Sequence, residues 1–83
     1  MKKVFILNYG DGGMLGIYSS VKKAVFAAQE AFTSRNLTMS GSQAAIAIKT
    51  LREAHGTARL LALEAADQYD AAKTLLIEKW SVL

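Results

Sequence analysis

The 83-residue sequence contains neither cysteine nor proline. The lack of cysteine excludes a disulfide framework and a thiolate zinc site, and a small chain without such cross-links is typical of the cytoplasm. No proline-rich, glycine/serine-rich or repeated segment suggests a linker. We therefore expect residues 1–83 to form one compact domain.

Long hydrophobic runs are also missing. Met1-Lys2-Lys3 followed by Val4–Leu7 has the look of a signal peptide, but the apolar run ends at Asn8. That run is too short for the hydrophobic part of a signal peptide and far too short to span a membrane. The sequence thus predicts a soluble intracellular protein without a membrane partner.

Residues for catalysis or metal binding are scarce. His55 is the only histidine, and its position near the end of a predicted helix is typical of a residue that serves the last carbonyl groups. Gly10-x-Gly12 follows a strand, but Leu15 stands where a dinucleotide-binding fingerprint needs its third glycine. No serine has the context of a nucleophile elbow. We expect a protein that is not an enzyme, with no catalytic residue, metal or cofactor.

The charge is modest and unevenly placed. Residues 1–42 carry five bases against two acids, whereas residues 43–83 carry five of each. This basic excess favours an acidic or nucleic-acid partner, although five dispersed bases are also an ordinary solubility pattern. Glu64, Asp67 and Asp70 form an acidic strip on a predicted helix, which is typical of a solvated face and can also meet a cation or a basic partner.

The strongest local signal lies in Val4–Ser20. Val4–Leu7 is a β-branched and aromatic run, residues 10–13 are rich in glycine, and residues 14–18 resume the apolar pattern. Two strand-like runs around a turn that tolerates positive φ predict a β-hairpin.

Three helices are expected after the hairpin. The first begins at a cap provided by Ser19 or Ser20, and Phe26 falls on its polar side. The second begins at Ser42 and ends at Gly56. The third covers Thr57–Ala72 with Leu60 on its outer face, although residues 59–64 also fit a strand. The predicted buried stripes are Val21, Ala24, Val25, Ala28 and Phe32 in the first helix, Ala44, Ala47, Ile48, Leu51 and His55 in the second, and Ala58, Leu61, Ala62, Ala65, Tyr69 and Ala72 in the third.

Thr74–Leu83 alternates in part between apolar and polar residues, which predicts a closing strand that pairs with the hairpin. The expected fold class is therefore α+β. It has a three-stranded antiparallel sheet, made of the N-terminal hairpin and the C-terminal strand, with two or three helices mainly on one face in the order ββαααβ.

Two segments resemble a known group of proteins. Lys3–Asp11 (KVFILNYGD) and Leu15–Ser20 (LGIYSS), running into Lys22-Lys23-Ala24, resemble the start of many small phage-encoded proteins of unknown function. Ile77–Val82 (IEKWSV) resembles the strand that closes the sheet in those proteins, whereas the alanine-rich residues 43–72 depart from the pattern. The resemblance implies a phage or mobile-element origin and a place in the host cytoplasm. Small proteins of this origin often bind and disable a host protein or nucleoprotein complex, as anti-CRISPR and other anti-defence inhibitors do.

Both rows of the first strand are largely apolar, so we expect one sheet face under the helices and a second, partly covered face. The second face is interpreted as a dimer interface or a binding surface. Phe5, Tyr9 and Tyr18 beside the lysines offer an alternative, a sheet that stacks nucleic-acid bases. Aromatic or charged character near the hairpin selects six candidate partner-binding residues, namely Tyr9, Asp11, Tyr18, Lys22, Phe26 and Trp80.

Overall fold

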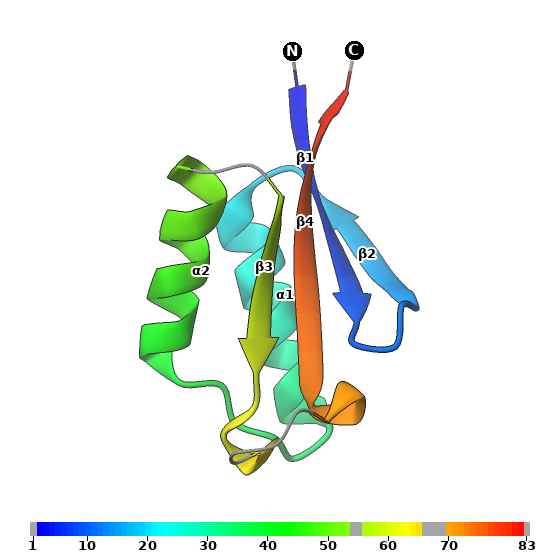
Figure 1. Ribbon diagram of the computed structural model, residues 1–83, viewed down its shortest axis with the longest axis vertical. Helices are drawn as coiled ribbons and strands as arrows, with labels where there is room; N and C mark the ends of the chain where they lie inside the picture. The colour runs from blue at the N-terminus through cyan, green and yellow to red at the C-terminus, as the bar shows by residue number, and fades with distance from the viewer. Residues whose placement is uncertain (1, 54–55, 66–69, 83) are drawn as a thin grey trace.

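The computed structural model describes residues 2–53, 56–65 and 70–82. It has an α+β architecture in which one antiparallel sheet with strand order β2-β1-β4-β3 packs against two helices (Figure 1). The elements are β1 (Lys2–Tyr9), β2 (Met14–Tyr18), α1 (Val21–Ser34), α2 (Gly41–Glu53), β3 (Thr57–Leu61) and β4 (Thr74–Val82), with short 3-10 helices η1 (Leu63–Ala65) and η2 (Ala71–Lys73) before β4. The α+β class is confirmed, whereas the sheet has four strands in place of the expected three.

The hairpin is confirmed by the pairing of β1 with β2. Tyr9 N–H donates to the Gly13 carbonyl (2.6 Å), and Gly12 N–H donates back to the Tyr9 carbonyl (3.0 Å). Gly12 has φ +105, a conformation that side chains other than glycine rarely adopt. The glycines between the strands therefore serve the geometry of the turn.

The closing strand is confirmed as β4. It pairs antiparallel with β1 from Lys2↔Val82 to Tyr9↔Leu75, so the two ends of the chain lie side by side (Figure 1). This long pairing places β1 and β4 at the centre of the sheet. Phe5–Asn8 of β1 and Leu75–Glu78 of β4 are paired on both sides, which satisfies the backbone hydrogen-bonding groups there.

The prediction of a third helix over Thr57–Ala72 is wrong. Residues 57–61 form β3, which pairs with β4 and seats Leu60 opposite Leu75. The spacing of alanine and leucine in this segment fits a helix and a strand equally. Tertiary packing favours the strand, because β3 then pairs with the outer edge of β4 and buries Leu60 completely. Of the later residues, 63–65 and 71–73 are 3-10 turns, and residues 66–69 lie outside the described part.

The two helices begin at serine caps. Ser20 accepts a hydrogen bond from Lys23 N–H (3.2 Å) at the start of α1, as expected. At α2 the cap is Ser40 and not Ser42, because Ser40 Oγ accepts from Gln43 N–H (3.2 Å). All five residues of the predicted α1 stripe are buried; in α2, Ala47 and Leu51 are buried and Ala44 and Ile48 are half-buried against the core. His55, expected on the α2 stripe, lies outside the described residues.

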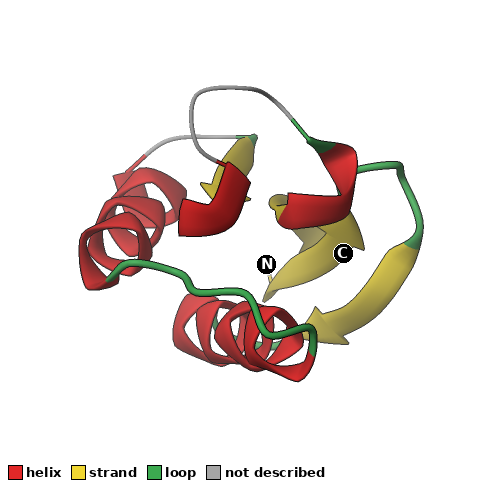
Figure 2. Ribbon diagram, turned by 90° about the horizontal axis from the view of Figure 1, so that it is seen from below, coloured by secondary structure: helices red, strands yellow, loops and turns green. Residues whose placement is uncertain are grey.

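The core lies between the sheet and the helices. Both helices cover the same face of the sheet, as an end-on view shows (Figure 2), and the expectation of helices on one face is confirmed. Alternate strand residues point into this layer, including Leu7, Leu60 and Ile77, each nearly or fully inaccessible to solvent. The other face of the sheet, which we call the open face, has no helix over it in the described residues. Among those residues no helix has the length and hydrophobicity needed to cross a membrane.

Candidate binding surface

The six candidate residues fall in three separate places. Tyr18, Lys22 and Phe26 line one surface hollow beside β2 and α1. Trp80 lies on the open face in β4, opposite Val4 of β1. Tyr9 and Asp11 belong to the end of the hairpin, where the chain's own groups engage both of them.

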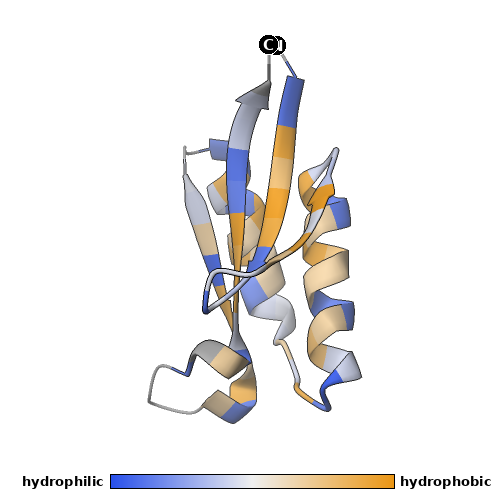
Figure 3. Ribbon diagram, turned by 90° about the vertical axis from the view of Figure 1, so that its right-hand side faces the viewer, coloured by the Kyte–Doolittle hydropathy of each residue, from blue (hydrophilic) through white to orange (hydrophobic). Residues whose placement is uncertain are grey.

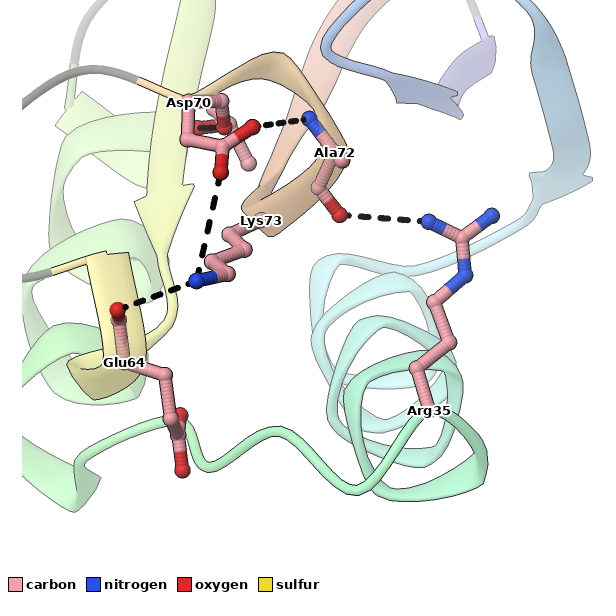
Figure 4. Close-up of polar contacts among 6 residues, drawn as sticks. Arg35, Glu64, Asp70, Ala72 and Lys73 are labelled. Atoms are coloured by element: carbon pink, nitrogen blue, oxygen red, sulfur yellow. Dashed lines mark hydrogen bonds and ion pairs between the residues drawn. The ribbon is translucent and has the colours of Figure 1, made fainter.

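Tyr9 and Asp11 have contacts that stabilise the fold. The Arg35 guanidinium lies 4.6 Å from the centre of the Tyr9 ring, and its Nη1 also donates to the carbonyl of Ala72 (3.2 Å; Figure 4). The Asp11 carboxylate accepts from Gly13 N–H (3.2 Å) within the turn. These contacts tie the hairpin end to the C-terminus of α1 and to η2, so both residues already have a role within the fold.

The hollow is mainly apolar and has a volume of about 490 Å³. Tyr18 and Phe26 supply its aromatic walls, and Ala27 lines it with them. The Tyr18 ring lies against Gly16, where a Cβ would approach its hydroxyl oxygen to 2.8 Å. Glycine in this strand thus allows the ring to lie along the backbone. Phe26 is 61% exposed, so the α1 face that a helix normally fills with polar residues carries a large apolar side chain.

Charge around the hollow is mostly positive. Lys22, Lys23 and Glu30 line it together with the aromatic residues. Lys22 has no hydrogen bond or ion pair within the described residues, while Lys23 Nζ donates only to the neighbouring Ser19 hydroxyl (3.4 Å). Two cations beside one carboxylate suit a ligand that brings a negative charge.

Beside the hollow runs an edge of the sheet. In the described residues β2 pairs only with β1, and none of the loop or turn hydrogen bonds involves its backbone. Figure 3 views the molecule from this side and shows α1 next to β2. A strand paired on one side leaves alternate N–H and C=O groups directed outward.

The open face adds a second apolar area. Met14 and Ile17 of β2 are 61% and 58% exposed, and Trp80 of β4 is 53% exposed. The cross-strand register places Ile17 beside Ile6 and Met14 beside Asn8. A polar pair lies within this area, where Asn8 Nδ2 donates to Glu78 Oε1 (2.6 Å). The second apolar row of the first strand therefore belongs to a surface that reaches the β2 edge.

The aromatic platform expected for nucleic acid is not formed. Phe5 is buried in the helix-covered core, and Tyr9 is engaged by Arg35. Both have the strand parity of Leu7, whose side chain also lies in that core. The nucleic-acid hypothesis then depends on the lysines and on Tyr18, which lines the hollow beside Lys22 and Lys23, and it predicts an affinity that falls steeply with salt.

Glu64 and Asp70, which were expected on one face of a third helix, lie at two different 3-10 helices. Glu64 lies in η1 and accepts hydrogen bonds from the backbone N–H and the hydroxyl of Thr38 (2.8 and 3.0 Å). Asp70 instead accepts from Ala72 N–H (3.0 Å) at η2, with Lys73 4.0 Å away (Figure 4). Asp67 lies outside the described residues, and the described ones contain no group of three or more acidic, histidine or cysteine residues suited to a metal ion.

The stability of the fold is expected to depend on pH through the Glu64 carboxyl. The hydrogen bond from Thr38 N–H is the largest cause that lowers the pKa of the Glu64 carboxyl below its ordinary value. A lowered folded pKa gives stability that is present above the unfolded pKa and is lost as the pH falls through the folded pKa. We expect Glu64→Gln to be less stable than the wild type near neutral pH, with the difference shrinking as the pH falls below about 4. Urea unfolding at several pH values measures this, and a constant difference would contradict it.

Comparison of the chain with protein-family models, with curated proteins and with solved structures finds no match. Sequence reasoning missed Met14 and Ile17 as surface residues of interest. The register of the hairpin could have identified them. Pairing Ile17 with Ile6 places both side chains on the face of the sheet opposite to that of Leu7.

Proposed function

We propose that this chain is a non-enzymatic binding protein that occludes a site on a protein partner by forming a stoichiometric complex. The observation that carries the proposal is the exposed apolar surface along β2 and the open face, where Met14, Ile17 and Trp80 are each more than half exposed. Exposed apolar groups of this size on a small protein favour a protein interface.

The resemblance to small phage-encoded proteins suggests the class of partner. Its motif residues include Leu15–Ser20 and Ile77–Val82, which contribute to the exposed surface through Ile17 and Trp80. On this basis the partner is a host protein or nucleoprotein complex, and the effect is inhibition of host defence of the anti-CRISPR type. The place of action is the host cytoplasm.

Affinity capture from a bacterial lysate tests the proposal with three forms of the chain. The wild type is compared with an open-face variant, Ile17→Lys combined with Trp80→Lys, and with Ile46→Lys. Ile46 is a matched control because it is 63% exposed but lies on α2. Melting curves confirm beforehand that all three forms fold.

We expect the wild type and Ile46→Lys to enrich the same protein at an integer ratio, and the open-face variant to lose it. Buried central contacts typically account for most of a binding energy, so a loss of at least about tenfold is expected. Failure of the wild type to enrich any protein stoichiometrically would contradict the proposal. Retention of nucleic acid alone, released by salt, would favour the nucleic-acid alternative.

A further inference from the structure

We infer that the outer edge of β2 and the adjoining hollow bind an extended, partly acidic segment of the protein partner, which adds to the sheet as a strand next to β2. This inference rests on the proposed function and specifies where and how the partner binds. The occupant has a stated chemistry, namely apolar residues at alternate positions and at least one Asp or Glu. Main-chain hydrogen bonds to an exposed sheet edge are a general way to bind such segments.

The two edges of the sheet differ in how they are protected. Natural edge strands are commonly blunted by charge or proline, which discourages pairing with other chains. At one edge, β3 carries the charged Arg59. At the other edge, β2 reads Met-Leu-Gly-Ile-Tyr, with no charge and no proline. The β2 edge is thus the one whose sequence favours an added strand.

Side chains on both sides of the β2 edge fit an added strand. Successive residues of an extended segment point to opposite faces of the sheet. On the open face they meet Ile17 and Met14, and on the helix side they enter the hollow between Tyr18 and Phe26. The hollow is shallow and mainly apolar, so it can take an apolar side chain of the added segment.

Strand addition at β2 would explain why several large hydrophobic side chains are exposed to solvent in the isolated chain. The large hydrophobic side chains that are exposed in the described residues number six, and Met14, Ile17 and Phe26 flank the β2 edge. Phe26 is notable because the rest of its helix keeps to a regular buried stripe. An added strand would cover all three side chains at once.

Charge complementarity selects an acidic segment. Lys22 and Lys23 lie at the hollow, and Glu30 is the one carboxylate among the described residues that line it. A partner carboxylate that approaches Lys22 gains a charge-assisted contact without displacing any ion pair in the described residues. A basic segment would be repelled.

Selection from a phage-displayed library of random linear peptides tests the inference, because it presents many extended segments to the β2 edge at once. We expect the selected peptides to share apolar residues at alternate positions and an Asp or Glu. A synthetic version of the best peptide is then titrated against the folded wild type and variants. Phe26→Ala and Lys22→Glu are each expected to weaken its binding at least about tenfold, whereas the control Ile46→Ala leaves it unchanged.

The expected main-chain hydrogen bonds between the peptide and β2 are tested separately. N-methylation of those peptide amides that face β2 should abolish binding, while methylation of the intervening amides should not. Binding that is equally strong in Phe26→Ala, or indifferent to the position of the methyl groups, would overturn the inference. So would a stable dimer of the chain, detected by ultracentrifugation, that fails to bind the peptide.

The two proposals fail in different ways. A captured partner that requires Ile17 and Trp80 but is unaffected by Phe26→Ala or Lys22→Glu leaves the proposed function standing and removes the β2-edge site. No stoichiometric partner and no selected peptide would remove both.

Discussion

Replacing Leu60 with alanine is expected to lower the free energy of unfolding by about 2–5 kcal/mol. Leu60 is fully buried in β3, where it lies opposite Leu75 beneath the helices. Truncation removes apolar contacts and leaves a cavity that the packed sheet and helices fill only in part. Since a small domain is stable by only about 5–15 kcal/mol, this one change removes a large share of the total.

Urea denaturation of the wild type, Leu60→Ala and Leu63→Ala measures this effect. Leu63 is a matched control because it is a nearby leucine that is 57% exposed, so its truncation should change the stability by about 0.5 kcal/mol or less. The experiment also decides between the two interpretations of residues 57–61. A helix with Leu60 on its outer face would make the two variants equally stable, and that result would contradict the strand.

Two phenylalanines of α1 give the second large effect. Phe32 is 2% exposed in the core, whereas Phe26 is 61% exposed at the hollow. We expect Phe32→Ala to cost about 3–5 kcal/mol, because a whole aromatic side chain leaves the packed interior. Phe26→Ala should change the stability by about 0.5 kcal/mol or less, because water already surrounds most of its ring.

Thermal unfolding followed by circular dichroism measures both variants. In a domain of this size each kcal/mol lowers the Tm by roughly 4–8 °C, so Phe32→Ala should melt far below Phe26→Ala. Because the two changes remove the same atoms from the same helix, helix propensity cancels in the comparison. Equal losses of stability would show that Phe26 is a core residue of this fold and not part of a binding surface.

The parts of the fold that the sequence predicted are those with strong local signals. The hairpin follows from glycines between two apolar runs, and α1 follows from a cap and a stripe that includes Phe32. The closing strand follows from the alternation around Trp80. In each case local backbone preference and the hydrophobic pattern favour the same structure.

β3 was missed because its local signal is ambiguous. Alanine and leucine at residues 58–62 favour a helix by intrinsic propensity, and their spacing satisfies a helical period as well as an alternating one. The deciding contribution comes from distant residues, since Leu75 and Ile77 of β4 pair with Leu60 and Ala58. A contact of this kind cannot be found from a window of neighbouring residues.

The candidate surface was predicted in part. Tyr18, Lys22 and Phe26 were selected separately for their character, and the turn from β2 into α1 brings them to one hollow. Tyr9 and Asp11 were selected for the same character, but Arg35 and Gly13 engage them within the fold. Whether a side chain is available to a partner depends on these tertiary contacts, which residue type alone does not show.

Amide hydrogen exchange of the folded chain, with and without saturating selected peptide, tests directly whether a strand adds to β2. Strand addition predicts that outward-facing amides of β2, within Met14–Tyr18, exchange more slowly in the complex, while amides of the opposite edge strand β3 are unchanged. Slower exchange at β3 or α2, with no change in β2, would show that the peptide does not add to the β2 edge.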